Sequence, residues 1–148
     1  MKRHAGFTVI ELLVTIVILF TASALFLSQK NRLEASALDD RRKVDINTLH
    51  HNLEKVYYAT HKAYPRELNE NTLPAVHPDT FKDPSGILIN QQKVSPLGIK
   101  TGESDYRYEA KGCDQQTGKC TSYILHTNLS LEADYTKHST HGNQSHKK

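Results

Sequence analysis

Residues 7–27 read FTVIELLVTIVILFTASALFL, and Glu11 is the only charged side chain among these 21 residues. At a rise of about 1.5 Å per residue, a helix of this length spans about 31 Å, which matches the hydrocarbon core of a bilayer at about 30 Å. No proline or glycine interrupts the chain from Phe7 to Tyr64. The stretch therefore predicts a membrane-spanning helix at 7–27, as the first part of a longer helix.

The residues around this helix indicate its orientation. Lys2 and Arg3 precede it and predict a cytoplasmic N-terminus, although Lys30 and Arg32 on the other side reduce the asymmetry. Between residues 7 and 135 there are 14 basic and 16 acidic side chains, so this part has a formal charge of −2. That balance argues against a nucleic-acid-binding fold with a basic surface throughout. The body is expected on the far side of the cytoplasmic membrane.

Glu11 is the exception in the apolar stretch. A carboxylate at the centre of a membrane helix costs about 2.5 to 3.5 kcal/mol, and less near its end, so its presence needs an explanation. One interpretation is that Glu11 lies one turn inside the membrane and its side chain reaches the headgroups. The other interpretation is that the Glu11 carboxylate pairs with a cationic group. Cleavage between Gly6 and Phe7 would create an α-amino group on Phe7 and leave Glu11 as the fifth residue of the mature chain.

The segment MKRHAG followed by FTVIELLVTIVIL resembles the class III signal and mature N-terminus of type IV pilins and type II secretion pseudopilins. The resemblance implies that a prepilin peptidase cuts after Gly6 and methylates the Phe7 amine. It also implies that Glu11 neutralises the Phe7 amine of a neighbouring subunit, which favours one axial register. The implied partners are this peptidase, membrane lipid before assembly, an inner-membrane assembly platform and other pilin subunits in a helical filament. Ser28 stands where many pilins have a helix-kinking proline, so the filament geometry does not carry over.

A competing interpretation comes from Ala22, Ser23 and Ala24, which form the A-x-A pattern of an ordinary secretory signal. Cleavage after Ala24 would release a secreted binding module, and an uncut helix would leave a membrane-anchored one. Glu11 would interrupt the apolar region of such a signal, and the new terminus would begin with the apolar residues 25–27. The pilin-like interpretation is therefore favoured.

The rest of the helix, residues 28–63, is predicted to be amphipathic. Its apolar side chains lie on one stripe at helical spacing: Ile46, Leu49, Leu53, Val56 and Tyr57. The run DDRRK at 39–43 is interpreted as a solvated face of the helix. Tyr64-Pro65 is expected to end the helix, because a residue that precedes proline disfavours the helical conformation.

The globular domain is predicted to span residues 64–135. Prolines and glycines make 65–105 a winding connection, in which Ile87–Ile89 is expected to be one short strand. Apolar residues alternate from Tyr106 and again occupy odd positions from Tyr123 to Tyr135, which predicts strands with one buried face. With the resemblance, the expected fold is α+β and pilin-like, with the long N-terminal helix packed on a C-terminal antiparallel sheet.

Cys113 and Cys120 are the only cysteines, and they bracket the polar loop DQQTGK. They are expected to form a disulfide that staples a hairpin in an oxidising compartment. A metal pair is less favoured, because no second cysteine or histidine pair lies nearby at ligand spacing. No cofactor is expected. The pseudopilin resemblance leaves calcium as an alternative through Asp105 and Asp114, although these lack a dense spacing of oxygen ligands.

Residues 136–148 contain no apolar side chain but include His138, His141 and His146, and they are expected to be a disordered tail. Its positive charge suits contact with DNA or another anionic surface polymer. The sequence shows no recognisable catalytic motif, so an enzyme is not expected. The expected function is structural: a major or minor pilin, with a type II secretion or competence pseudopilin as the alternative. Filaments that serve adhesion, motility, DNA uptake or secretion have subunits with this same N-terminus, so the sequence does not separate these roles.

Overall fold

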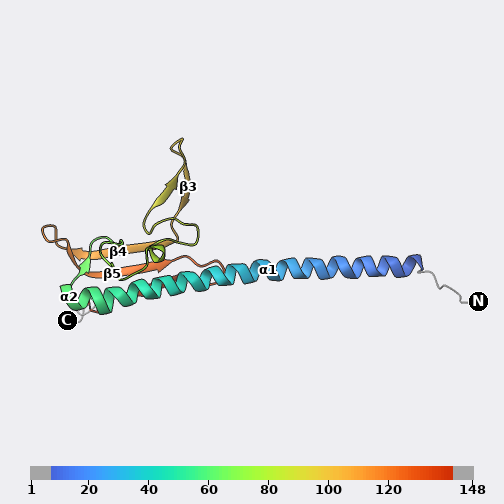
Figure 1. The fold of residues 1–148 in the computed structure, drawn as a ribbon, viewed down its shortest axis with the longest axis horizontal. Helices are drawn as coiled ribbons and strands as arrows, with labels where there is room; N and C mark the ends of the chain where they lie inside the picture. The colour runs from blue at the N-terminus through green and yellow to red at the C-terminus, as the bar shows by residue number, and fades with distance from the viewer. Residues whose placement is uncertain (1–7, 142–148) are drawn as a thin grey trace, which may run out of the picture. The chain divides into compact units, whose positions relative to one another are not determined.

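The computed structural model describes residues 8–141, which divide between Ala37 and Leu38 into two compact units. The N-terminal unit is helical from Val9 onward. The C-terminal unit contains the remainder of the long helix, a four-stranded sheet and a two-stranded sheet (Figure 1). The predicted α+β class, with a long N-terminal helix followed by antiparallel strands, is confirmed.

The long helix begins as α1 (Val9–Asn52) and continues through a π-helical turn (Leu53–Tyr57) into α2 (Tyr58–His61). Lys62 ends it in the left-handed conformation at φ 52°, where its N–H donates to the Tyr58 carbonyl oxygen over 2.9 Å. The chain then enters the two-residue strand β1 (Tyr64–Pro65). The helix therefore ends just before Tyr64-Pro65, as the sequence predicts.

The buried stripe of the helix agrees with the prediction except at Val56, which lies in the π-helical turn. Ile46, Leu49 and Leu53 are fully buried, but Val56 is 48% exposed. A π-helical turn forms hydrogen bonds five residues apart, so it rotates the following positions relative to a continuous α-helix. The side chains that pack against the core at this end are Tyr57 and Tyr58.

The main sheet is antiparallel and has β5 at its centre. Its three longer strands are β4 (Tyr106–Cys113), β5 (Lys119–Thr127) and β6 (Tyr135–His138). β4 pairs with one edge of β5, and β1 and β6 share the other. As the alternation predicts, these side chains are buried in the core: Tyr106, Tyr108, Tyr123 and Leu125.

Between β5 and β6 the chain leaves the sheet. The odd-numbered apolar pattern predicts a strand here, but residues 128–134 lie outside every strand, and Leu131 is 51% exposed. The reason is a side chain of the helix. The backbone N–H groups of Ser130 and Leu131 donate to the Asp39 carboxylate over 2.8 and 2.9 Å, so these donors do not join a strand ladder.

A separate hairpin consists of β2 (Gln92–Val94) and β3 (Lys100–Glu103). In Figure 1 it projects away from the sheet of β4 and β5. The strand predicted at Ile87–Ile89 is wrong, because Leu88 makes a single isolated bridge, to Lys82. The Asp83 carboxylate accepts the Ile87 N–H over 2.9 Å, which forms a turn instead. A short 3-10 helix (Pro78–Phe81) precedes this turn.

Asn90 covers part of the outer edge of β4. Its side-chain amide accepts the Tyr108 N–H and donates to the Tyr108 carbonyl oxygen, each over 2.8 Å. Its own backbone N–H donates to the Tyr106 carbonyl oxygen over 3.1 Å. Asn90 has a φ of 62°, a conformation that asparagine tolerates better than most residues. One residue thus reproduces the bonding of a neighbouring strand.

The predicted disordered tail begins as an ordered segment. Residues 136–138 belong to β6, and Ser139 is buried, so the prediction is wrong for the part that is described. The Ser139 N–H donates to the Tyr123 carbonyl oxygen over 3.1 Å, and the His141 ring stacks on Tyr58 with the centroids 4.2 Å apart. The remainder of the tail, 142–148, lies outside the described residues.

Candidate functional site: the exposed apolar helix and a buried charge network

The N-terminal unit presents apolar side chains on every side of α1. Each residue from 8 to 34 is exposed, and the exposed fractions of Val9 and Phe20 are 83% and 76%. The helix is long and apolar enough to cross a membrane. Such a surface is stable in lipid or against other apolar helices, and not in water.

Glu11 lies in the first turn of α1 and is exposed. Its backbone N–H donates to Thr8 Oγ1 over 3.4 Å, so a threonine hydroxyl caps the start of the helix. Gly6 and Phe7, the predicted cleavage and methylation residues, lie outside the described residues. The pairing of Glu11 with a Phe7 amine therefore stays a prediction.

The hydroxyl groups in the apolar helix are bonded within it. Thr21 Oγ1 donates to the Val17 carbonyl oxygen over 3.0 Å, and Ser23 Oγ donates to the Leu19 carbonyl oxygen over 2.8 Å. These bonds satisfy the hydroxyls in an apolar environment, and α1 runs through both residues without interruption. Glu11 thus stands out as the only charge in this stretch.

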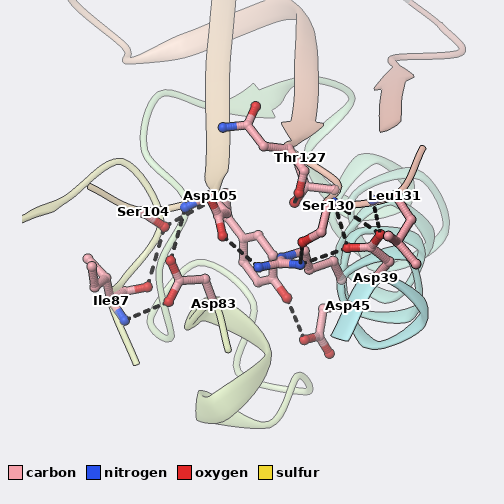
Figure 2. A network of polar contacts seen from close by, with 12 residues as sticks. Asp39, Asp45, Asp83, Ile87, Ser104, Asp105, Thr127, Ser130 and Leu131 are labelled. Carbon is pink, nitrogen blue, oxygen red and sulfur yellow. Dashed lines mark hydrogen bonds and ion pairs between the residues drawn. The ribbon is translucent and has the colours of Figure 1, made fainter. Parts of the chain in front are cut away.

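At the start of the C-terminal unit, α1 carries a buried ion-pair network (Figure 2). Asp39 is 2% exposed and accepts from Arg42 Nη1 over 2.8 Å, and Arg42 Nη2 donates to Asp105 over 2.9 Å. The interpretation of 39–43 as a solvated face is therefore wrong at two of its positions. Asp39 and Arg42 extend the stripe of Ile46 with spacings of three and four residues, and this spacing was the available signal.

Hydrogen bonds keep Asp39 ionised. Burial opposes ionisation, but the backbone N–H groups of Ser130 and Leu131 and the Arg42 guanidinium outweigh it and lower the pKa of Asp39 below its ordinary value of 3.8. The ionised carboxylate joins the helix to a loop 91 residues later in the chain. The network therefore fastens the membrane-side end of the C-terminal unit's helix to its sheet.

Two further carboxylates hold the start of β4 beside this network (Figure 2). Tyr106 Oη donates to Asp45 over 2.8 Å, and Asp83 accepts the Asp105 N–H over 3.0 Å. Burial raises the pKa of Asp45 and also that of Tyr106, so the tyrosine keeps its proton and acts as the donor. Asp83 is buried and fixes the backbone of the residue that pairs with Arg42.

The two residues considered for calcium serve different parts of the fold. Asp105 is paired with Arg42, whereas Asp114 accepts the N–H groups of Gln116 and Thr117 over 2.7 and 3.2 Å. Across residues 8–141, no three histidine, cysteine, aspartate or glutamate side chains are grouped so that they could hold a metal ion. Asp114 instead shapes the loop of the β4–β5 hairpin.

Cys113 and Cys120 form a disulfide across paired positions of β4 and β5. It closes the loop 114–119, in which Gly118 adopts a φ of 66° and donates its N–H to the Asp114 carbonyl oxygen over 3.0 Å. Glycine adopts this left-handed conformation without steric cost. The hairpin is therefore closed by both a covalent bond and a tight turn.

Replacing both cysteines by serine is expected to lower the free energy of unfolding by about 2 to 3 kcal/mol, because the bond restricts the unfolded chain. Urea unfolding of the full chain in detergent, followed by the near-UV circular dichroism of its tyrosines, would measure the change. Reduced wild-type protein is the control and should match the variant. Identical midpoints for the oxidised, reduced and substituted forms would contradict the stabilising role.

Another buried carboxylate, Glu54, lies in the π-helical turn. It is 7% exposed and accepts from Tyr64 Oη, Tyr123 Oη and the Thr140 N–H over 3.0, 3.0 and 3.1 Å. Burial opposes its ionisation, but these donors lower the pKa of Glu54 below its ordinary value of 4.5. No pattern in the sequence indicated a role for Glu54, yet it fastens residues 139–141 to the far end of the helix.

The C-terminal unit is expected to lose stability as the pH falls below about 4.5. Asp39 and Glu54 have lowered pKa values in the folded state, so the unfolded chain binds protons first. The stability that they contribute is present above their ordinary pKa values and is lost as the pH falls through the folded ones. Urea midpoints from about pH 7 to pH 3 would measure it. Glu54→Gln should flatten this slope, and the exposed control Glu67→Gln should not; equal slopes would contradict the assignment.

Comparison with known proteins adds one match. Residues 1–27 match the family model described as the Prokaryotic N-terminal methylation motif, which is the class III signal of type IV pilins and pseudopilins. No curated protein and no solved structure matches the chain. The resemblance read from MKRHAGFTVIELL is confirmed, and the motif implies processing by prepilin peptidase and assembly with other pilin subunits. The chain therefore carries the N-terminal signal that type IV pilins and pseudopilins share.

Proposed function

We propose that this protein is a structural subunit of a type IV pilus-like filament, cleaved after Gly6, methylated on Phe7 and assembled through its N-terminal helix. The observation that carries the proposal is the methylation motif at 1–27 on a helix whose apolar surface is exposed on every side. That surface suits lipid before assembly and the helices of other subunits afterwards. The proteins with this motif are structural, and the subunit is proposed to perform no catalysis.

Glu11 supplies the alignment in this proposal. A subunit that enters an apolar helix bundle out of register leaves the Glu11 carboxylate and a Phe7 amine without partners, and each unpaired charge is heavily penalised there. In register, the two opposite charges meet where water is excluded, and their attraction is strong. The pairing therefore makes one axial position the favoured one.

The C-terminal unit is proposed to lie outside the cytoplasmic membrane, first beside it and later on the filament surface. The positive charges of Lys2 and Arg3 before the helix favour a cytoplasmic N-terminus. The Cys113–Cys120 disulfide suits an oxidising compartment on the other side. Both observations support the same orientation.

The decisive measurement is the intact mass and N-terminal residue of the protein isolated from the envelope of its native cell. A chain that starts at methylated Phe7 and is recovered from sheared surface filaments would support the proposal. A chain that starts at Leu25, or an uncut chain that starts at Met1, would overturn it. Those results would favour the secreted or membrane-anchored binding module instead.

A further inference from the structure

The tip of the β2–β3 hairpin is an ordered apolar projection. Its loop is closed by hydrogen bonds from the Ser95 N–H to the Ile99 carbonyl oxygen and from the Gly98 N–H to the Ser95 carbonyl oxygen, over 2.8 and 2.9 Å. Thr101 Oγ1 adds a bond across the strands to the Lys93 carbonyl oxygen over 3.1 Å. The tip therefore keeps its shape without help from the main sheet.

This tip exposes large apolar side chains that the body does not cover. Val94, Leu97 and Ile99 are 52%, 85% and 62% exposed, and all three lie within six consecutive residues. A cluster of apolar side chains that the molecule leaves uncovered marks an interaction site. Leu97 is the most exposed of them and stands at the turn.

The charge of the tip is entirely positive. Lys93 and Lys100 flank its apolar residues, and no acidic residue occurs from 84 to 102. The nearest acid at the base, Glu103, is paired with Arg107 over 2.6 Å. A partner surface would therefore combine an apolar pocket with a negative rim.

The same unit has a partly apolar pocket with one acidic residue, Glu70, in its lining. A cavity of about 260 Å³ is lined by the apolar side chains of Leu68, Phe81, Leu88 and Ile89, with Glu70 and Asn71 at its polar part. Leu68, Phe81 and Ile89 are buried core residues, whereas Glu70 and Asn71 are exposed. The cavity is smaller than a typical drug-sized ligand site of at least about 300 Å³, and it suits one or two side chains.

We propose that the hairpin tip of one subunit docks into this cavity of a second copy of the chain, with Leu97 as the anchor and Lys93 or Lys100 facing Glu70. The tip and the cavity are different surfaces, so the contact is heterologous and can repeat from subunit to subunit, and it builds an open filament when the rotation between subunits does not close a ring. Such a contact suits a helical filament. The inference rests on the proposed function and adds to it a second subunit contact, separate from the apolar helix.

Cysteine cross-linking tests the contact directly. The described cysteines are both in the disulfide, so Leu97→Cys and Asn71→Cys would add the reactive thiols. The double variant is expected to give a ladder of disulfide-linked multimers under mild oxidation, both in sheared filaments and in membranes that contain assembling subunits. Co-expressed single variants should give dimers only. Leu97→Cys with Gln116→Cys, whose second site is an exposed hairpin loop, is the matched control.

Charge and apolar variants test the chemistry. Leu97→Asp is expected to lower filament yield at least tenfold while the amount of cleaved subunit is unchanged, and Leu97→Met should restore it. Lys93→Glu with Lys100→Glu should weaken assembly, and adding Glu70→Lys should recover it. Because Leu97 is 85% exposed, its replacement leaves the core intact.

The outcomes separate this inference from the proposed function. Filaments that form normally with Leu97→Asp and without the cross-linked ladder would overturn the docking contact and leave the filament proposal standing. If the cross-linked ladder appeared in membranes of cells that never form filaments, the docking contact would be supported and the filament proposal would be overturned. If neither the cross-linked ladder nor filaments were observed, both the docking contact and the filament proposal would be overturned.

Discussion

A Glu11→Ala subunit is expected to be cleaved after Gly6 as efficiently as the wild type and yet to be nearly absent from filaments. In the proposed filament, the carboxylate and the Phe7 amine of a neighbour would neutralise each other among apolar helices. Removal of one partner of a buried pair costs about 3 to 5 kcal/mol, which corresponds to more than a hundredfold in the equilibrium for incorporation. The measurement is the ratio of variant to wild-type subunit in sheared filaments from a strain that expresses both.

Two further variants show whether the charge itself is responsible. Thr15→Ala lies one turn along the same helix and should enter filaments normally, since its hydroxyl bonds to the Glu11 carbonyl within the helix. Glu11→Gln keeps the size of the side chain but not its charge, and it should behave like Glu11→Ala. If either Glu11 variant is incorporated at the wild-type ratio, the charge pairing has no role in assembly.

Asp39→Ala is expected to lower the free energy of unfolding of the C-terminal unit by about 3 to 5 kcal/mol, because the buried Arg42 guanidinium loses one of its two carboxylate partners and keeps only Asp105. The backbone N–H groups of Ser130 and Leu131 lose their acceptor in the same step. Urea unfolding of the full chain in detergent, followed by tyrosine near-UV circular dichroism, would measure the loss.

Asp40→Ala is the matched control, because Asp40 is the next residue of the same helix and is exposed. Its effect should stay within about 0.5 kcal/mol, as for most surface substitutions. An additional replacement, Arg42→Met, should recover part of the stability that Asp39→Ala loses, since it removes a buried charge that has lost one of its two partners. Equal stability of the Asp39 and Asp40 variants would show that the buried network does not hold the helix to the sheet.

The features that the sequence predicted correctly depend on residues close together in the chain. The helix follows from an unbroken run without proline or glycine, and its end follows from Tyr64-Pro65. The strands β4 and β5 follow from the alternation of Tyr106, Tyr108 and their partners. In each case the local pattern and the final environment agree, so local reasoning was sufficient.

Two of the errors, at residues 39–43 and near Leu131, share a different cause. Asp39 and Arg42 look like surface charges until a loop around Ser130 supplies donors from 91 residues away. The same contact removes the strand predicted near Leu131. Burial of an ion pair depends on partners that are distant in sequence, and the residues next to the pair in the chain do not reveal those partners. The spacing of Asp39 and Arg42 on the buried stripe was the one local sign.

The end of the helix shows a third limit. The π-helical turn changes which side chains face the core, so Val56 is exposed and Glu54 is buried. A shift of this kind arises from the packing of Tyr64, Tyr123 and residues 139–141 around Glu54. The sequence offered only polar residues and one glycine for that tail, and these residues gave no sign that its first part is ordered.

The bonding of Asn90 to β4 has a consequence for a chain that is proposed to assemble with copies of itself. A free strand edge invites pairing with the same edge of another molecule, and such pairing leads to disordered aggregates and amyloid. Asn90 occupies the outward N–H and carbonyl oxygen of Tyr108 with a side chain that cannot propagate a ladder. The subunit thereby withdraws part of its sheet from self-association, which leaves ordered polymerisation to surfaces that fix a single geometry.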